Sequence, residues 1–215
     1  MSGAHEDLDE RLLHRLLFFS DAVFAIVMTL LVLDLHPPEL AQGAGPAELL
    51  SAIGGKLFAF ALSLAILGIF WIAHLSTTRR LQHFDWPATL AILGFLFPVC
   101  LIPFASSWLG SAVAPDCAWG VYAAVMMLTS VGNIVMVLVQ SRGGGRLIAG
   151  GVTPRQLFYR VARSAAPGVD FAVGVAGAIT GHVRLTQFCW VLIPIYLLLV
   201  RLTLQPKEER RVKTA

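Results

Sequence analysis

Charged residues are scarce in this chain of 215 residues, where Asp, Glu, Lys and Arg together make up 13%. In soluble domains about a quarter of the residues are charged, so this composition excludes an ordinary soluble domain. Hydrophobic residues reach 57% and lie in long runs, several of which match the ~20 residues that a helix needs to cross a bilayer. We therefore expect a membrane protein.

Cysteine is scarce too. The three cysteines, Cys100, Cys117 and Cys189, are odd in number and far apart, which argues against a disulfide framework or a zinc site. Two motifs of enzymes that act within or beside membranes, His-Glu-x-x-His and Gly-x-Ser-x-Gly, are absent. We expect no enzymatic activity, no cofactor and no protein-bound metal.

Six apolar segments indicate transmembrane helices. The expected spans cover residues 12–35, 57–75, 88–110, 118–139, 165–179 and 188–200. Six spans of ~20 residues leave only short loops and tails, without room for a second globular domain. The predicted fold is an all-α polytopic membrane protein, in which residues 1–215 form a single domain with six transmembrane helices.

The distribution of basic residues indicates the orientation of these spans. If the chain crosses six times with both ends inside, fourteen of the sixteen Lys and Arg residues fall on one side, and only Lys56 and Arg184 fall on the other. Basic residues concentrate on the cytoplasmic side of membrane proteins, so both termini are expected in the cytoplasm. The basic residues that give the net charge of +3 are distributed as a membrane topology predicts, so we do not expect nucleic acid as a partner.

Polar residues in the first two spans predict a contact between helices. An ionisable group at the centre of a lone transmembrane helix costs at least ~2.5 kcal/mol, so Asp21, beside Ser20, needs a partner. Trp71 and His74 share one helical face at the same end of the second span. We predict a network that joins Ser20 and Asp21 to Trp71 and His74. Its role is either a clamp between the two helices, which we favour, or a proton relay.

The rest of the first span carries an apolar stripe. Ile26, Leu30 and Leu33 follow one another at i, i+4 and i+7, and Thr29 lies beside them. An entirely apolar helix has such a stripe on every face, so the pattern by itself fits lipid contact and packing as well as it fits a pore.

A dense local pattern distinguishes these possibilities. The first span reads Arg15-x-x-x-Phe19-Ser20-Asp21 and continues as Val23-Phe24-Ala25-Ile26-x-x-Thr29-Leu30-Leu31. It resembles the signature of the bacterial branch of the transmembrane-protein-175 family of potassium-permeable channels. Trp71-x-x-His74 and Pro103-Phe104 extend the resemblance, whereas Leu75-Ser76 departs from the further His or Arg that often follows the histidine.

The resemblance implies a homotetramer in the inner (plasma) membrane of a bacterium, with the first helices lining a central pore. It implies a channel with moderate selectivity for potassium over sodium, whose hydrophobic filter consists of Ile26, Leu30 and Leu33 with a hydroxyl layer from Thr29. The residues implied to tie the first span to its neighbours are Arg15, Phe19, Ser20, Asp21, Trp71 and His74. The implied partners are copies of the same chain, permeant potassium ions and membrane lipid.

A secondary transporter of a small cation or solute is the alternative. Such a protein needs a charged substrate site near the middle of the membrane. The deep candidates, Asp21 and Asp170, have no obvious basic or second acidic companion in the sequence.

Overall fold

The computed structural model describes residues 2–38, 45–111 and 113–204, and the regular secondary structure of this part is helical apart from one isolated bridge between Leu81 and Ile148. The long helices are α1 (Ser2–Leu30), α2 (Pro46–Thr78), α3 (Trp86–Gly110), α4 (Pro115–Gln140), α6 (Pro154–Ile179) and α8 (Leu192–Leu204). The shorter ones are η1 (Leu31–Asp34), α5 (Arg142–Gly145), α7 (Val183–Phe188) and η2 (Cys189–Val191).

Within the described residues, four helical segments are long and apolar enough to cross a membrane: Leu8–Asp34, Pro46–Thr78, Trp86–Gly110 and Pro115–Gln140. They correspond to the first four expected spans. The fifth expected span lies in α6, which also carries three arginines and Asp170, and the sixth runs from the end of α7 through η2 into α8, an apolar helix of 13 residues. An all-helical membrane fold is therefore shown, while length and composition alone do not support the last two spans.

α6 begins at Pro154, well before the expected residue 165. The Thr153 side chain accepts a hydrogen bond from the Gln156 amide (3.3 Å), and the Gln156 side chain accepts one from the Thr153 amide (2.9 Å). This reciprocal cap, followed by proline in the first turn, starts a helix firmly. The helix therefore extends about three turns before the expected span of residues 165–179, which lies within it.

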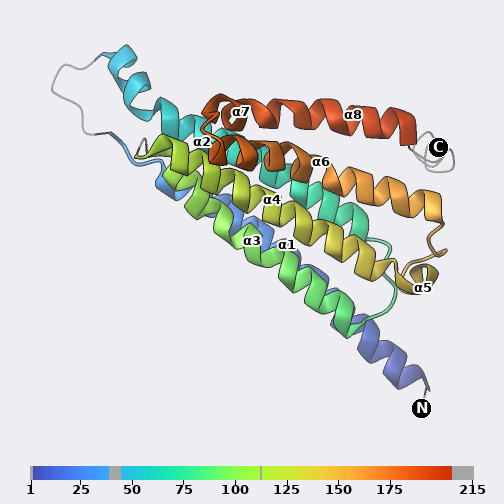
Figure 1. Cartoon of the computed structure of the whole chain (residues 1–215). Helices are drawn as coiled ribbons and strands as arrows, with labels where there is room; N and C mark the ends of the chain where they lie inside the picture. Colours follow the sequence, from blue (N-terminus) through green and yellow to red (C-terminus); the bar gives the residue numbers. More distant parts are fainter. Residues whose placement is uncertain (1, 39–44, 112, 205–215) are drawn as a thin grey trace.

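The helices form a slanted bundle in which α1 lies at one edge, against α2 and α3, while α8 lies on the far side of α6 (Figure 1). The first turn of α1, the last turn of α8 and the loops that precede α3 and α6 all lie toward the same end of the bundle (Figure 1). The segments before α3 and α6 carry Arg79, Arg80, Arg142 and Arg146, so the helical arrangement gathers these positive charges at one end.

α3 and α4 form the centre of the core. Ile92, Phe95, Val99 and Ile102 are fully buried along α3. α4 approaches it closely at Gly132, where any Cβ atom would come within 3.0 Å of the Phe95 Cα atom. Without a hydrophobic driving force between helices in lipid, such small residues allow the close contact that holds membrane helices together.

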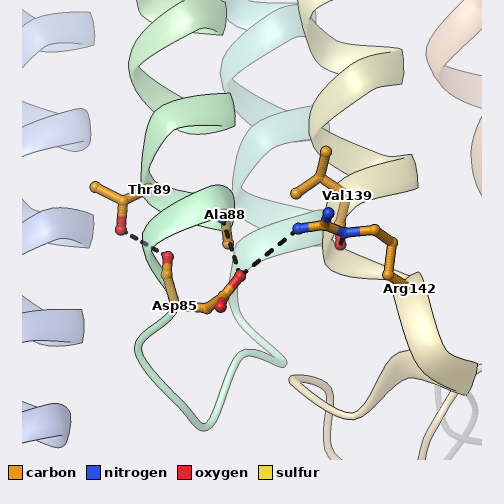
Figure 2. A network of polar contacts seen from close by, with 5 residues as sticks. All are labelled: Asp85, Ala88, Thr89, Val139 and Arg142. Atoms are coloured by element: carbon orange, nitrogen blue, oxygen red, sulfur yellow. Dashed lines mark hydrogen bonds and ion pairs between the residues drawn. The ribbon is translucent and has the colours of Figure 1, made fainter.

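A polar network joins the start of α3 to the end of α4 (Figure 2). Asp85 accepts hydrogen bonds from the Ala88 amide (3.2 Å) and, through its backbone carbonyl, from the Thr89 hydroxyl (2.9 Å). Its carboxylate also lies 3.9 Å from the Arg142 guanidinium, which donates to the Val139 carbonyl (3.2 Å). This cap satisfies a donor that α3 would otherwise leave unpaired at its N-terminus.

Candidate functional site

α1 has two contrasting faces. Leu13, Ser20, Phe24, Val27 and Leu31 are buried at spacings of seven, four, three and four residues, so they form one stripe that faces the bundle. The predicted filter residues lie on the opposite side. Because α1 lies at the edge of the bundle, most of this outer face is left uncovered by the other described helices.

The filter stripe is strongly exposed in the single chain. Ile26 is 57% exposed, Leu30 42% and Leu33 65%. The exposed Thr29 hydroxyl donates to the Ile26 carbonyl at 2.8 Å. Since a hydroxyl has one hydrogen and two lone pairs, the Thr29 oxygen can still accept a hydrogen bond or contact a cation outside the helix.

Ser20 and His74 form the buried part of the predicted network. Ser20 Oγ lies 2.8 Å from His74 Nε2 and also donates to the Leu17 carbonyl at 2.8 Å, and both side chains are fully buried. The single hydroxyl hydrogen is used on Leu17, so His74 Nε2 carries the proton that Ser20 accepts. His74 Nδ1 is then a bare acceptor, and it is buried without a hydrogen-bond partner among the described residues.

Two phenylalanines enclose the His74 ring. Phe24 of α1 lies 5.7 Å from it between ring centroids, and Phe95 of α3 stacks on it at 5.5 Å. The two phenylalanine rings are 5.9 Å apart, so the three rings join α1, α2 and α3. The sequence does not predict this role of Phe95, because nothing local to α3 indicates which of its faces meets the histidine.

Asp21 and Trp71 form the outer part of the network. Trp71 Nε1 donates to Asp21 Oδ1 at 3.2 Å, and both residues lie at the surface. A second contact fixes the far end of the segment, where the Ser107 hydroxyl of α3 donates to Asp34 Oδ1 at 2.8 Å. α1 and η1 are thus attached to the bundle at two levels. A lone serine such as Ser107 gives no sequence signal for this contact.

The structure does not bring Arg15 and Phe19 into this network. Both are exposed on the same outer side as the filter stripe, Phe19 by 51%. Within the described residues, Arg15 makes neither a hydrogen bond nor an ion pair. In a single chain these two residues therefore do not contact the other predicted clamp residues.

Asp170 is buried on α6, and its Oδ2 atom has no hydrogen-bond partner among the described residues. Asp21, the other carboxylate within an expected span, is exposed on α1 at the edge of the bundle, so the two do not form one site. The described part of the chain also contains no group of three His, Cys, Asp or Glu residues that could hold a metal ion.

Comparison with known proteins supports the resemblance carried by the first span. Residues 15–103 match the family described as the endosomal/lysosomal potassium channel TMEM175. A protein of Streptomyces collinus, named a potassium channel, is 33% identical over 116 residues, which cover 53% of this chain and 55% of the relative. A Chryseobacterium protein with the same kind of name is 27% identical over 131 residues, covering 60% of this chain and 66% of the relative.

The chain thus spans between about half and two thirds of these relatives. Its fold is similar to the crystal structure of a lysosomal potassium-selective channel TMEM175 homolog from Chamaesiphon minutus, with a TM-score of 0.74 at 19% identity. The similarity covers 89% of this chain and 99% of that one. The resemblance predicted from the sequence is therefore confirmed, and the fold is that of this channel.

Proposed function

We propose that this chain, whose residues 15–103 match the TMEM175 family, forms a homotetrameric, potassium-permeable channel with α1 at its axis. The observation that carries the proposal is the outer face of α1, where Ile26, Leu30 and Leu33 are 42–65% exposed opposite a fully packed face. Four such faces around one axis would bury each other's apolar side chains and enclose a narrow path. The names of the bacterial relatives agree with conduction of potassium.

We further propose six membrane spans within one domain, with both termini in the cytoplasm. α6 has 26 residues, about 39 Å of helix, and its three arginines lie in the first ten residues, where they can reach the interface. Its only other charge, Asp170, is buried against protein and does not face lipid. The segment from α7 to α8 then crosses back toward the basic end of the bundle. The bacterial inner membrane is the expected location.

The selectivity of such a pore would come from side chains. Aliphatic rings cannot replace the water that is removed from an ion, so a narrow ring blocks and a slightly wider one passes the ion that gives up part of its shell more readily. Potassium is larger than sodium and holds water less tightly. We therefore expect a moderate preference for potassium that depends on the diameter at Ile26, Leu30 and Leu33, with Thr29 as a polar layer between them.

In this mechanism the network around His74 has a positioning role. It attaches the inner face of α1 to α2 and α3, so that the outer face is held toward the axis in a fixed rotation. Arg15 and Phe19, which lie on the outer side of α1, would contact the neighbouring subunits instead. All six residues of the predicted clamp then contribute, four within a subunit and two between subunits.

A secondary transporter is the alternative, and the buried carboxylate of Asp170 is the one feature that favours it. A transporter needs a second charged group at the substrate site. Among the described residues, no cation lies within 4.0 Å of the Asp170 carboxylate. The geometry therefore favours the channel.

Recordings from purified protein in planar bilayers test the proposal. With potassium on one side and sodium on the other, we expect passive single-channel currents that reverse on the potassium side of zero voltage. Empty bilayers and protein-free detergent are the controls. An ion flux that requires a counter-ion gradient, or the absence of any current from tetrameric protein, would contradict the channel.

A further inference from the structure

Four arginines line one concavity at the basic end of the bundle, between the end of α2 and the first turns of α6. The concavity has a volume of about 50 Å³. Its charged and hydroxyl-bearing lining consists of Arg79, Arg80, Arg160, Arg163, Ser76, Thr77 and Ser164. It lies at the end of the potential transmembrane segment Pro46–Thr78, whose last turns contribute Ala73 and Thr77, so the arginines that follow would lie at the headgroup level of a bilayer.

The size and the donors of this concavity fit a phosphate group. A buried water occupies roughly 10–15 Å³ on this measure, so the space holds about four waters, which is close to the size of a tetrahedral oxyanion. Guanidinium groups bind phosphate oxygens with paired hydrogen bonds, better than ammonium groups do. Within the described residues, neither Arg79 nor Arg163 forms an ion pair or a side-chain hydrogen bond.

Backbone contacts hold the loop that carries Arg79 and Arg80 beside the segment that leads into α6. The Ala149 amide donates to the Arg80 carbonyl and the Gln82 amide donates to the Leu147 carbonyl, each at 2.9 Å. These bonds join the loop after α2 to the loop that leads into α6. Because the contacts hold like charges close together before any ligand arrives, they provide a preformed site for an anion.

A second, mostly apolar cavity of about 150 Å³ continues from the first and shares Ala73, Arg163 and Ser164 with it. It extends between α2, α6 and α8, along Ile69, Ile72, Pro167 and Leu197. A free phosphate ion would make no favourable contact with this apolar extension. A phosphate that carries a hydrocarbon chain would occupy both parts.

We propose that the paired cavities bind an anionic phospholipid, with its phosphate on the four arginines and the beginning of an acyl chain between α2, α6 and α8. Basic pockets between helices at the cytoplasmic side are suited to anionic headgroups. The site lies on the side of α2 that faces α6, away from the outer face of α1, so it does not depend on the proposed pore. It requires only that α2 and α6 lie in a membrane.

Lipid binding to the full chain in detergent tests this site without any measurement of ion current. The probes are dioleoylphosphatidylglycerol, dioleoylphosphatidylcholine and inorganic phosphate, and the readouts are retained lipid in native mass spectra and the melting temperature as a function of probe concentration. We expect phosphatidylglycerol to bind at least tenfold more tightly than phosphatidylcholine, and inorganic phosphate to have no comparable effect. Equal stabilisation by inorganic phosphate would overturn the lipid and indicate a site for soluble anions.

Variants locate the binding. Arg79→Gln and Arg163→Gln should each weaken phosphatidylglycerol binding about fivefold, and the double variant roughly 25-fold. Arg155→Gln is the matched control, because this exposed arginine is also on α6 but lines neither cavity, and it should change the affinity less than twofold. An unchanged affinity in the double variant would refute the site.

Two further variants keep the test valid if the double variant does not fold. Arg163→Lys retains the charge but loses the planar pair of donors, so it should weaken binding less than Arg163→Gln does. Leu197→Trp fills the apolar cavity and should reduce phosphatidylglycerol binding. Full binding in the Leu197→Trp variant would exclude the acyl-chain part of the proposal.

Discussion

Removal of the Ser20 hydroxyl alone should destabilise the protein more than removal of the Ser20 hydroxyl together with the His74 imidazole. In the wild type, buried His74 Nε2 lies 2.8 Å from Ser20 Oγ and is assigned as the donor, because the Ser20 hydroxyl donates to the Leu17 carbonyl. Ser20→Ala leaves this N–H buried with no acceptor, because the surrounding rings of Phe24 and Phe95 cannot accept a hydrogen bond of similar strength. An orphaned buried donor costs about 1–3 kcal/mol.

The double variant Ser20→Ala/His74→Phe removes donor and acceptor together. The phenylalanine ring can retain the stacking on Phe95 and the contact with Phe24, and removing both partners of a hydrogen bond is close to neutral when shape is kept. The Leu17 carbonyl, which also accepts from the Ser20 hydroxyl, keeps its backbone hydrogen bond within α1. The double variant should therefore be more stable than Ser20→Ala, although it carries one more substitution.

Thermal unfolding of the detergent-purified protein measures this difference. For a chain of this size, 1 kcal/mol corresponds to roughly 2–4 °C in melting temperature, so Ser20→Ala should lower it by roughly 2–12 °C. Ser76→Ala is the matched control, because its hydroxyl bonds only the Ala73 carbonyl of its own helix and its loss orphans no buried donor. A double variant that is less stable than Ser20→Ala would refute the assigned donor and acceptor.

Three other predictions concern the pore, the assembly and the packing. Leu30→Ala should widen the proposed filter and shift reversal potentials toward equal permeability for potassium and sodium, whereas Leu90→Ala, at an exposed position of α3, should not. Arg15→Ala removes an exposed charge from the outer side of α1, so we expect normal melting but a reduced tetramer fraction in size-exclusion chromatography; an intact tetramer would contradict a role of Arg15 between subunits. Gly168→Ala should destabilise by about 1–3 kcal/mol, since its Cβ atom would lie 2.6 Å from Ser130 Oγ, while Gly94→Ala meets nothing within 4 Å and should be neutral or stabilising.

The two-faced character of α1 connects the stability of a subunit with its proposed conduction. The buried stripe of α1 and the packed rings of Phe24, His74 and Phe95 fix the rotation of the helix. This rotation determines which side chains of α1 point outward. A substitution that loosens the inner contacts therefore changes the geometry of the outer stripe without touching it. For the proposed channel, positioning residues on α2 and α3 influence selectivity through the orientation of α1.

Several features could be read from the sequence because their causes are local. Length and apolarity of the first four runs determine membrane helices wherever they pack. The spacing of Trp71 and His74 places both on one face, at the level where Ser20 and Asp21 need partners, and the structure brings Ser20 to His74 and Asp21 to Trp71. These inferences need only the period of a helix and the cost of a polar group in lipid.

Other features were decided by tertiary structure alone. An apolar helix offers a stripe on every side, so only packing against α2 and α3 determined that Phe24 faces inward and Leu30 outward. Phe95 meets His74, and Arg79 comes to lie beside Arg163, because distant segments are joined by close helix packing and by two backbone bonds between loops. The sequence determined which segments enter the membrane, since hydrophobicity and helical period are local properties; the folded structure determined which faces meet, since that depends on complementary shapes far apart in the chain.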